Sequence, residues 1–241
     1  MPTAEITRKS ALLTNLADIN TRIARACAAA GRDPSAVELL AVTKYAASPD
    51  VKLLLDAGAI KTAGENKVQD AASKWTKGNL AAARTVLSLH FIGHLQTNKA
   101  RAAVEIFDWI DSIDSVKIAA EVNRHAGACG KVMPVLIQLK LTASASQSGV
   151  GLAQAGELLA AVQAMPNLAP RGYMGIAPAG ATAQELKNVF AAAKTIFDRD
   201  FPLSAGKHGF KNYLSLGMSG DFELAVQAGA NLPRIGSALF A

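Results

Sequence analysis

A single lysine, Lys44, ends the apolar run VELLAVTK at residues 37–44. A strand of this composition is expected to be buried, and a charged amine at its end is most simply explained as solvated. A lysine can also form a Schiff base with an aldehyde, provided that burial or nearby cations favour its neutral amine. The other residues expected around Lys44 must decide between these two interpretations.

Two segments near the end of the sequence have the residue types of an anion site. In LSLGMSGDFE, residues 214–223, an apolar run leads into Ser219 at the start of an expected helix, and RIGSALF presents Gly236 and Ser237 at the end of the last expected strand. Glycine allows a ligand to approach the backbone closely, and hydroxyl and backbone N–H groups bind anions. Either segment alone is more simply explained as helix capping, but the pair at adjacent strand ends favours a phosphate site.

Lys44 and this phosphate site together suit a phosphorylated aldehyde, and pyridoxal 5′-phosphate (PLP) is such an aldehyde. Arg234 lies two residues before Gly236, so both are expected to point to the same side of the last strand. Arg234 could therefore donate a hydrogen bond to the pyridine nitrogen of PLP, with Lys44 as the covalent anchor.

The elements that must position these residues alternate between strands and helices. Apolar residues at helical spacing predict a first helix over about residues 5–31, which stops at Gly31. Eight short apolar runs then predict strands, separated by segments of helical pattern. The expected strands cover residues 37–44, 61–66, 85–93, 108–114, 132–141, 168–177, 212–218 and 231–240.

Eight strands alternating with helices indicate a parallel sheet covered by helices, either closed or open. No change of composition and no linker divides the sequence into two lobes, which disfavours a doubly wound open sheet. We therefore expect a single α/β domain over residues 1–241, a (β/α)8 TIM barrel with an extra N-terminal helix. Active sites of such barrels form at the carboxyl ends of the strands, where Lys44 is expected.

Charge and composition argue against several classes of function. The formal charge is +6 and the isoelectric point is near 9.4, but the basic residues are scattered and form no run typical of a nucleic-acid surface. No window has the length of a transmembrane helix, and the N-terminus lacks the apolar core of a signal peptide. The two cysteines and four histidines lack the spacing of metal ligands. We expect a cytoplasmic protein with no metal and with no nucleic-acid or membrane partner.

Other polar residues are expected at or near the strand ends. His94 could be a general acid or base, but a structural role is favoured because no carboxylate partner can be identified from the sequence. Gln138 and Lys140 lie on the fifth expected strand, and whether Lys140 points into the barrel stays open. His90 is expected in the core, and Trp109 is expected to pack between helix and barrel.

The motifs LLAVTKY, AGENKVQDAASKW, LHFIGHLQTNK, SIDS, SQSG, RGYMGI, LSLGMSGDFELAVQAGA and RIGSALF follow one another over about residues 10–240. In this combination, which is far more specific than any one motif, the chain resembles the YggS/PROSC-type PLP-binding proteins, also called PLP homeostasis proteins. The resemblance implies a barrel shared with the N-terminal domain of alanine racemase, which is the fold-type III barrel of PLP proteins.

The resemblance also implies which residues hold the cofactor. Lys44 would bind PLP as a Schiff base, and Asn66, in the GEN motif, would lie beside its ring. The other implied cofactor-binding residues are Ser219, Gly236 and Ser237 at the phosphate, Arg234 near the pyridine nitrogen, and Ser215 and Met218 as near neighbours. An arginine at the pyridine nitrogen is always cationic, leaves that nitrogen unprotonated and makes the cofactor a weak electron sink.

The sequence departs from the family pattern at several positions. Ala63 and Lys67 flank the GEN motif where an aromatic residue and a tyrosine are usual, and Gln147 replaces a common lysine. The acidic residue usual just upstream of Gln147 is absent, and MGIAPAG, residues 174–180, departs from a more typical Met-Thr-Ile-Pro. None of these positions belongs to the implied anchor, arginine or phosphate serines, so cofactor binding is still expected.

The expected function is PLP binding in intracellular vitamin B6 and amino-acid homeostasis without strong catalytic turnover, with PLP-accepting apoenzymes as further partners. The alternative is a PLP-dependent amino-acid racemase, which needs a second base that alanine racemases take from a partner subunit's C-terminal β-domain. The sequence ends at Ala241, five residues after Gly236, so we expect neither that domain nor its dimer interface and predict a monomer. A Schiff-base aldolase fits less well, because such enzymes usually carry the lysine on a later strand among acidic residues.

Overall fold

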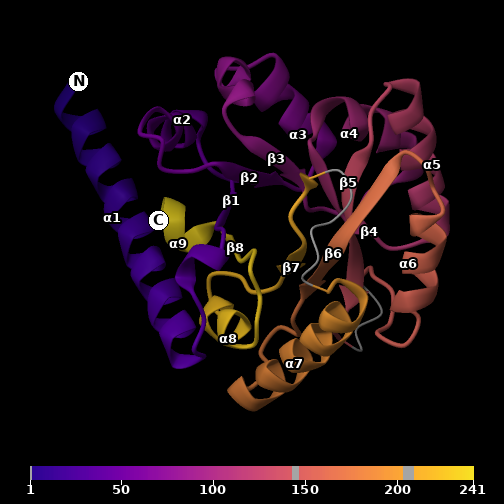
Figure 1. Cartoon of the computed structure of the whole chain (residues 1–241). Helices are drawn as coiled ribbons and strands as arrows, with labels where there is room; N and C mark the ends of the chain where they lie inside the picture. Colours follow the sequence, from indigo (N-terminus) through magenta and orange to yellow (C-terminus); the bar gives the residue numbers. More distant parts are fainter. Residues whose placement is uncertain (1, 143–146, 203–208) are drawn as a thin grey trace.

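The computed structural model describes residues 2–142, 147–202 and 209–241, and within them eight strands form one sheet (Figure 1). These strands are β1 (Leu40–Val42), β2 (Thr62–Glu65), β3 (Ser88–Phe91), β4 (Trp109–Ile113), β5 (Met133–Lys140), β6 (Leu168–Ile176), β7 (Tyr213–Ser215) and β8 (Arg234–Ile235). All paired strands are parallel, in the order β7-β6-β5-β4-β3-β2-β1-β8. Each strand falls within a range expected from the sequence.

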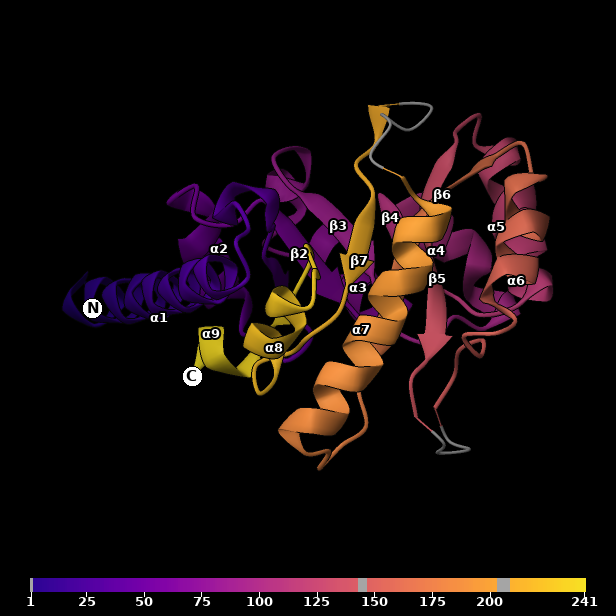
Figure 2. The same ribbon diagram turned by 60° about the horizontal axis from the view of Figure 1, so that its bottom comes forward.

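Helices connect the strands and cover the outside of the sheet (Figure 1). The α-helices in the described residues are α1 (Pro2–Ala29), α2 (Ser48–Asp56), α3 (Val68–Ala71), α4 (Ala100–Ile106), α5 (Val116–Ala128), α6 (Ala155–Gln163), α7 (Ala183–Asp200), α8 (Phe222–Gln227) and α9 (Ser237–Phe240). Short 3-10 turns occur at η1 (Pro34–Ala36), η3 (Ala81–Thr85) and η4 (Thr97–Lys99), and a π turn occurs at η2 (Ala72–Thr76). Figures 1 and 2 both show α1 beside α8 and α9. None of the helices in the described residues is long and apolar enough to cross a membrane.

The edges of the sheet at β7 and β8 meet without a strand ladder. The backbone N–H of Arg234 donates to the carbonyl of Gly217 at 2.9 Å. The hydroxyl of Ser215 donates to the carbonyl of Leu232 at 3.0 Å. These hydrogen bonds join the two edges, so the barrel is nearly closed and the carboxyl ends of its strands face one end. The expected (β/α)8 barrel with an N-terminal helix is confirmed.

Side chains from strands around the sheet fill the interior of the barrel. One buried cluster consists of Leu40, Trp109, Leu136, Met174, Tyr213 and Leu232. Because these residues come from strands that do not all neighbour one another, the cluster can only lie inside the barrel. Trp109 stacks on His90 there, with ring centroids 5.1 Å apart. The expected packing of Trp109 between helix and barrel is therefore wrong, whereas the core position of His90 is confirmed.

The last expected strand is much shorter than the sequence pattern indicated. It was expected over residues 231–240, but β8 is Arg234–Ile235 and residues 237–240 form α9. A short apolar run such as SALF is compatible with either a strand or a helix. Gly236 and Ser237 therefore lie at the junction of β8 and α9 rather than at the end of a long strand.

Candidate functional site

A cavity of about 1030 Å³ opens at the carboxyl ends of the strands. Residues expected at the site that line it are Lys44, Asn66, Met218, Ser219, Arg234, Gly236 and Ser237. They follow or belong to β2, β1 and β8, which are neighbours in the sheet, and β7, which hydrogen bonds join to β8. Ser215 is fully buried and does not line the cavity, but its hydroxyl accepts a hydrogen bond from Arg234.

Lys44 faces the cavity because its neighbour Thr43 faces the other way. The Thr43 side chain is fully buried, and its hydroxyl donates to Oε1 of Glu65 at 2.8 Å. Successive side chains of an extended segment alternate in direction. The Lys44 amine lies 5.1 Å from the ring centroid of Tyr45, which is 84% exposed. Lys44 thus presents an amine to the cavity beside an exposed aromatic ring.

A buried carboxylate fixes the ends of β1 and β2. Oε1 of Glu65 accepts hydrogen bonds from the Thr43 hydroxyl at 2.8 Å, from the Lys74 ammonium at 2.9 Å and from the Trp75 indole at 3.2 Å. Lys74 also donates to the carbonyl of Thr43 at 2.6 Å. Lys74 and Trp75 are consecutive residues of the π turn, and both reach the same carboxylate oxygen. Thr43 and Glu65 each precede a cavity residue, so this network fixes the points from which the cavity residues project.

Asn66 reaches the cavity past Gly93, which lies two residues after the end of β3. A Cβ atom on Gly93 would lie 2.1 Å from the backbone oxygen of Asn66, which no side chain tolerates. Only glycine therefore allows the two strand ends to approach this closely. Gly93 was not singled out from the sequence, although it ends the strand expected over residues 85–93 and a glycine in a strand pattern is a signal of close backbone approach.

Arg234 is a buried cation that lines the cavity. Its side chain is 4% exposed, with Nη1 donating to the Ser215 carbonyl at 2.7 Å and hydroxyl at 2.9 Å and Nη2 donating to the Gly175 carbonyl at 2.8 Å. Burial lowers the pKa of Arg234 to about 10, although the charges of Asp111 and Asp221 act to raise it. The guanidinium therefore stays charged at neutral pH, in a position fixed by β6 and β7.

The residues expected at a phosphate lie on two adjoining loops. The hydroxyl of Ser219 accepts a hydrogen bond from the backbone N–H of Ala238 at 3.3 Å, which joins the loop after β7 to α9. A Cβ atom on Gly236 would meet the Cβ and carbonyl oxygen of Val42 at 3.2 Å, so glycine permits the close packing of β8 on β1. Ser237 follows directly and lines the same cavity. Two hydroxyl groups are thus available to one ligand.

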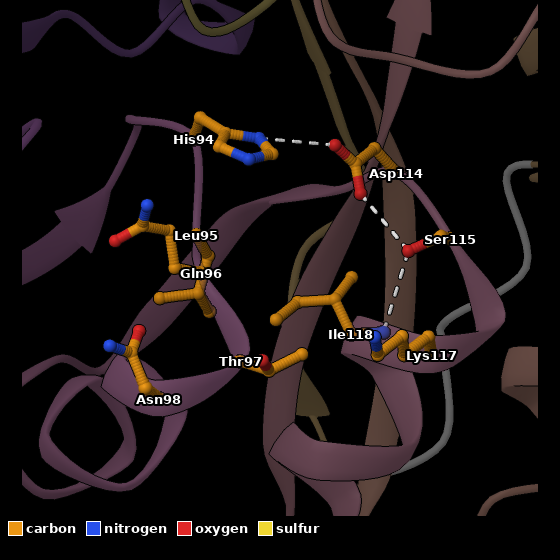
Figure 3. Close-up of a pocket in the computed structure, with 9 residues that line it drawn as sticks. All are labelled: His94, Leu95, Gln96, Thr97, Asn98, Asp114, Ser115, Lys117 and Ile118. Carbon is orange, nitrogen blue, oxygen red and sulfur yellow. Dashed lines mark hydrogen bonds and ion pairs between the residues drawn. The ribbon is translucent and has the colours of Figure 1, made fainter.

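His94 has the carboxylate partner that the sequence reasoning did not find. Its Nδ1 lies 3.3 Å from Oδ2 of Asp114 (Figure 3) and 3.0 Å from the hydroxyl of Ser148. A structural role was favoured for His94 because the sequence identified no carboxylate partner, and the structure supplies that partner. The physical reason is that β3 and β4 pair in parallel, which brings the residues after their carboxyl ends together.

His94 also lines a second pocket, of about 400 Å³ (Figure 3). The walls of this side pocket come from the loop after β3, the turn η4 and the start of α5. Its polar lining residues are Gln96, Thr97, Asn98, Asp114, Ser115 and Lys117. His94 therefore stands between the main cavity and a polar side pocket.

Two glutamines line the main cavity near the end of β5. Nε2 of Gln138 donates to the carbonyl of Ser148 at 2.9 Å, and Nε2 of Gln147 donates to the carbonyl of Ile176 at 3.1 Å. Lys140, whose direction the sequence left open, does not belong to the cavity lining in the described part of the chain. Residues 143–146, which begin the unusual loop before Gln147, lie outside the described residues.

This arrangement suits an anionic ligand that carries an electrophilic carbon. Lys44 offers a nucleophilic amine, while the hydroxyls of Ser219 and Ser237 and the buried charge of Arg234 suit an anion. No group of three or more His, Cys, Asp or Glu side chains suited to a metal ion occurs among residues 2–142, 147–202 and 209–241.

Proteins of known family match the chain over most of its length. Residues 14–241 match the family model described as alanine racemase, N-terminal domain. A pyridoxal phosphate homeostasis protein of Escherichia coli K12 is 37% identical over an alignment of 233 residues that covers 94% of each chain. A pyridoxal phosphate homeostasis protein of Pseudomonas aeruginosa is 36% identical over 231 residues, which cover 96% of this chain and 95% of its own.

Solved structures share the fold. PipY of Synechococcus elongatus, solved with PLP bound, is 34% identical and has a TM-score of 0.76, covering 92% of this chain and 100% of its own. An alanine racemase of Clostridium difficile has a TM-score of 0.68 at 12% identity, covering 97% of this chain and 56% of its own. At 12% identity, the likeness to the racemase shows only that the two chains share the barrel fold.

Proposed function

Because this chain belongs to the pyridoxal phosphate homeostasis proteins, within the family that carries the alanine racemase N-terminal domain, we propose that it binds PLP as a Schiff base on Lys44. The bound cofactor serves intracellular PLP and amino-acid homeostasis, without strong catalytic turnover. PLP is the ligand of the related PipY structure, which matches this chain at 34% identity.

The observation that carries this proposal is that Lys44 shares one cavity with Ser219, Ser237 and Arg234. The aldehyde of PLP requires an amine, its phosphate requires hydrogen-bond donors, and its ring requires an enclosed space. The cavity of about 1030 Å³ offers all three and is large for a single cofactor, since small-ligand sites generally measure roughly 300–1,000 Å³. The residues present therefore fit the cofactor.

Each cavity residue has a separate task in this proposal. Lys44 bonds to the aldehyde carbon, and the hydroxyls of Ser219 and Ser237 donate to the phosphate with the backbone near Gly236. Asn66 lies beside the ring, in the position that Gly93 leaves open to it. PLP supplies an electrophilic aldehyde and a pyridine ring that accepts electrons when its nitrogen is protonated.

Arg234 limits that chemistry. Its guanidinium is held by hydrogen bonds to Ser215 and Gly175 and remains charged at neutral pH, since burial lowers its pKa only to about 10. A fixed cation beside the pyridine nitrogen disfavours protonation of that nitrogen, so the ring accepts electrons poorly. Arg234 therefore favours holding the cofactor over turning an amino acid over.

A PLP-dependent amino-acid racemase is the alternative function. Racemisation needs a second base besides Lys44, and His94 with its partner Asp114 is a base that lines the same cavity. L-Alanine incubated with the PLP-loaded protein and resolved by chiral chromatography separates the two functions. Formation of D-alanine at rates comparable to known racemases would overturn the homeostasis proposal, whereas unchanged L-alanine supports it.

The visible absorption spectrum of the PLP-loaded protein tests the proposed anchor. A Schiff base absorbs visible light, and borohydride reduction traps it as an added mass on one lysine. Lys44→Ala is expected to abolish both signals. Lys52→Ala, at an exposed lysine of α2 that pairs with Asp56, is the matched control and is expected to retain both. An unchanged absorption band in Lys44→Ala contradicts the proposal.

A cytoplasmic location belongs to the same proposal. Cys27 and Cys129 are both free thiols, as is usual in a reducing compartment. A monomeric state and PLP-accepting apoenzymes as recipients of the cofactor stay predictions from the sequence.

A further inference from the structure

Side chains of α1 hold the end of the one-turn helix α9, which lies beside α1 in Figures 1 and 2. The guanidinium of Arg8 donates from Nη2 to the carbonyl of Phe240 and from Nη1 to the carbonyl of Ala241, both at 2.9 Å. Further along α1, the amide of Asn15 donates to the carbonyl of Leu239 at 3.1 Å. The last carbonyls of a helix lack intrahelical partners, so α1 supplies the donors that α9 itself cannot.

The same guanidinium joins α9 to α2. Nε and Nη2 of Arg8 donate to Oδ2 of Asp50 at 3.1 and 2.8 Å. Asp50 lies in the first turn of α2, which begins four residues after Lys44, and its side chain is only 17% exposed. All three nitrogens of Arg8 are therefore engaged. Because a guanidinium is planar and rigid, this one group fixes how α2 and α9 lie relative to each other.

The partners of Arg8 belong to the wall of the main cavity, whereas Arg8 itself does not. Asp50, Phe240 and Ala241 all line the cavity, and Arg8 is absent from its lining in the described part of the chain. Arg8 can therefore act on a ligand in the cavity only through the segments that it joins.

The helix α9 is too short to fix its own position. It spans residues 237–240, and a helix of one turn does not persist without tertiary contacts. The hydrogen bond from the backbone of Ala238 to Ser219 joins its start to the loop after β7. Arg8 and Asn15 hold its end. Loss of the hold at the end would let α9 tilt, which changes where the Ser237 hydroxyl points.

The anchor side of the cavity is held independently of Arg8. Thr43, directly before Lys44, donates to the buried carboxylate of Glu65, with which Lys74 also pairs. Loss of Arg8 is therefore expected to loosen α9 more than the Lys44 segment. Its effect should fall on the contacts to a phosphate rather than on the bond to an aldehyde.

We propose that Arg8 is a positioning residue for the cofactor: by tying the end of α9 to α2, it keeps Ser237 on the phosphate of PLP and slows the release of PLP. This inference rests on the proposed function, since Ser237 has a phosphate to hold only if PLP occupies the cavity. A protein that holds PLP for use elsewhere must also release it. The contacts of Arg8 then help to set the rate of that release.

The release of PLP from the full-length loaded protein tests this role. The Schiff-base absorbance is followed after dilution into alkaline phosphatase, which destroys free PLP and prevents rebinding. Arg8→Ala is expected to speed release about tenfold, the effect of losing about one hydrogen bond to a charged group. Arg8→Lys keeps the charge but cannot span Asp50 and both carbonyls, so its rate should lie between those of wild type and Arg8→Ala.

Pyridoxal, which lacks the phosphate, distinguishes positioning of the phosphate from general support of the cavity. Equilibrium titration by absorbance gives the affinity of each protein for PLP and for pyridoxal. In Arg8→Ala the affinity for PLP is expected to fall, whereas the affinity for pyridoxal should change less than about twofold, because the Lys44 segment keeps its own contacts.

Arg84→Ala is the matched control. Arg84 also bridges one carboxylate and two backbone carbonyls, those of Asp108, Leu87 and Ile106, but it does so at the amino ends of β3 and β4. In the described part of the chain, neither Arg84 nor these partners line the main cavity. This variant loses contacts of the same kind, so its stability should fall while PLP leaves at the wild-type rate.

Hydrogen–deuterium exchange in the PLP-free protein gives a measure that does not depend on the cofactor. Residues 237–241 are expected to exchange faster in Arg8→Ala than in wild type, while β4 and β5 exchange as in wild type. Arg84→Ala should leave exchange at residues 237–241 unchanged. Unchanged exchange there in Arg8→Ala would mean that Arg8 does not hold α9, which overturns the proposed role.

The outcomes separate this role from the proposed function. Failure of borohydride to trap PLP on wild-type Lys44 overturns both. Normal trapping with equal PLP release in wild type and Arg8→Ala, or equally fast release in Arg84→Ala, overturns the role of Arg8 alone. An equal loss of affinity for PLP and pyridoxal also overturns it. If Arg8→Ala does not fold, Arg8→Lys decides, since a wild-type release rate in that variant contradicts the proposal.

Discussion

Lys74 reaches Glu65 from outside the barrel, with 2.9 Å between its Nζ and a carboxylate whose side chain is fully buried. The pair lies directly behind the ends of β1 and β2, where Thr43 also donates to Glu65 at 2.8 Å. Lys44 follows Thr43 along the chain, and Asn66 follows Glu65. The contact on the outer face of the sheet therefore fixes the positions from which Lys44 and Asn66 enter the cavity. The ends of β1 and β2 are therefore held by an ion pair that does not line the cavity.

Replacement of Glu65 by alanine is expected to destabilise the fold by about 3 kcal/mol, because it leaves the ammonium of Lys74 partly buried without its partner. Urea denaturation measures the loss. Removal of an exposed pair by Lys52→Ala is expected to cost well under 1 kcal/mol. Equal midpoints for the two variants would show that the Glu65 network contributes no more than a surface ion pair.

Arg234→Ala is expected to loosen the seam between β7 and β8. The substitution removes donors to the carbonyls of Ser215 and Gly175 and leaves these buried acceptors unsatisfied, at about 1–3 kcal/mol for each. Hydrogen–deuterium exchange over residues 213–218 and 231–236 is expected to accelerate more than exchange in β4 and β5. Arg101→Ala, at an exposed arginine of α4, serves as the control. Uniform acceleration across the sheet would contradict a local effect at the seam.

Much of the fold could be predicted because its signals are local. Eight apolar runs separated by helical patterns indicate a parallel barrel. The strand ends then indicate which residues share the cavity, and Lys44 and Ser237 both line it. The short apolar run after Gly236 carries no such signal, since its pattern suits a strand as well as the helix α9.

Contacts that depend on strand register could not be predicted in the same way. His94 meets Asp114 only because β3 and β4 pair side by side, and it meets Ser148 across 54 residues of sequence. Trp109 stacks on His90 inside the barrel because β3 and β4 pair with these two residues in register, which the sequence of either strand alone does not show. The hydrogen bonds of Gln138 and Gln147 depend on which carbonyls the folded loops place beside their amide nitrogens.

The phosphate site is expected to discriminate PLP from pyridoxal, which has the aldehyde but no phosphate. Ser219→Ala and Ser237→Ala are each expected to weaken PLP binding about tenfold, because each removes a hydrogen bond to a charged oxygen. The affinity for pyridoxal should change little. Equilibrium titration by absorbance measures both affinities, with Ser10→Ala on α1 as the control. An equal loss for both ligands would mean that the serines support the fold and not the phosphate.

Acid is expected to destabilise the protein partly through Glu38. Burial alone would raise the pKa of Glu38, but hydrogen bonds from Thr62 and Tyr213 and the charge of Lys211 outweigh it and hold the pKa below its ordinary 4.5. A depressed pKa contributes stability above the unfolded value, and this stability is lost as the pH falls through the folded pKa. The free energy of unfolding, measured in urea from pH 7 to pH 3, should therefore fall less steeply in Glu38→Gln. Identical slopes in both proteins would contradict this contribution.

Gly93→Ala is expected to damage the cavity without removing any functional group. Its Cβ atom would lie 2.1 Å from the backbone oxygen of Asn66, so the ends of β2 and β3 must separate. Overpacking of this kind costs about 1–3 kcal/mol. The separation also moves Asn66 away from the place where the cofactor ring is proposed to lie, so PLP affinity should fall together with stability.

Gly156→Ala provides the matched comparison for that substitution. Gly156 lies in α6, where a new Cβ would meet Nη2 of Arg199 at an ordinary contact distance of 3.6 Å. Alanine is also favoured over glycine within a helix by up to about 1 kcal/mol, so this variant should be at least as stable as wild type and bind PLP equally well. Thermal unfolding measures the stability of both variants, and PLP titration measures their affinity for the cofactor. Wild-type PLP affinity in Gly93→Ala would mean that the position of Asn66 is not needed for the cofactor, since the crowding acts on that residue first.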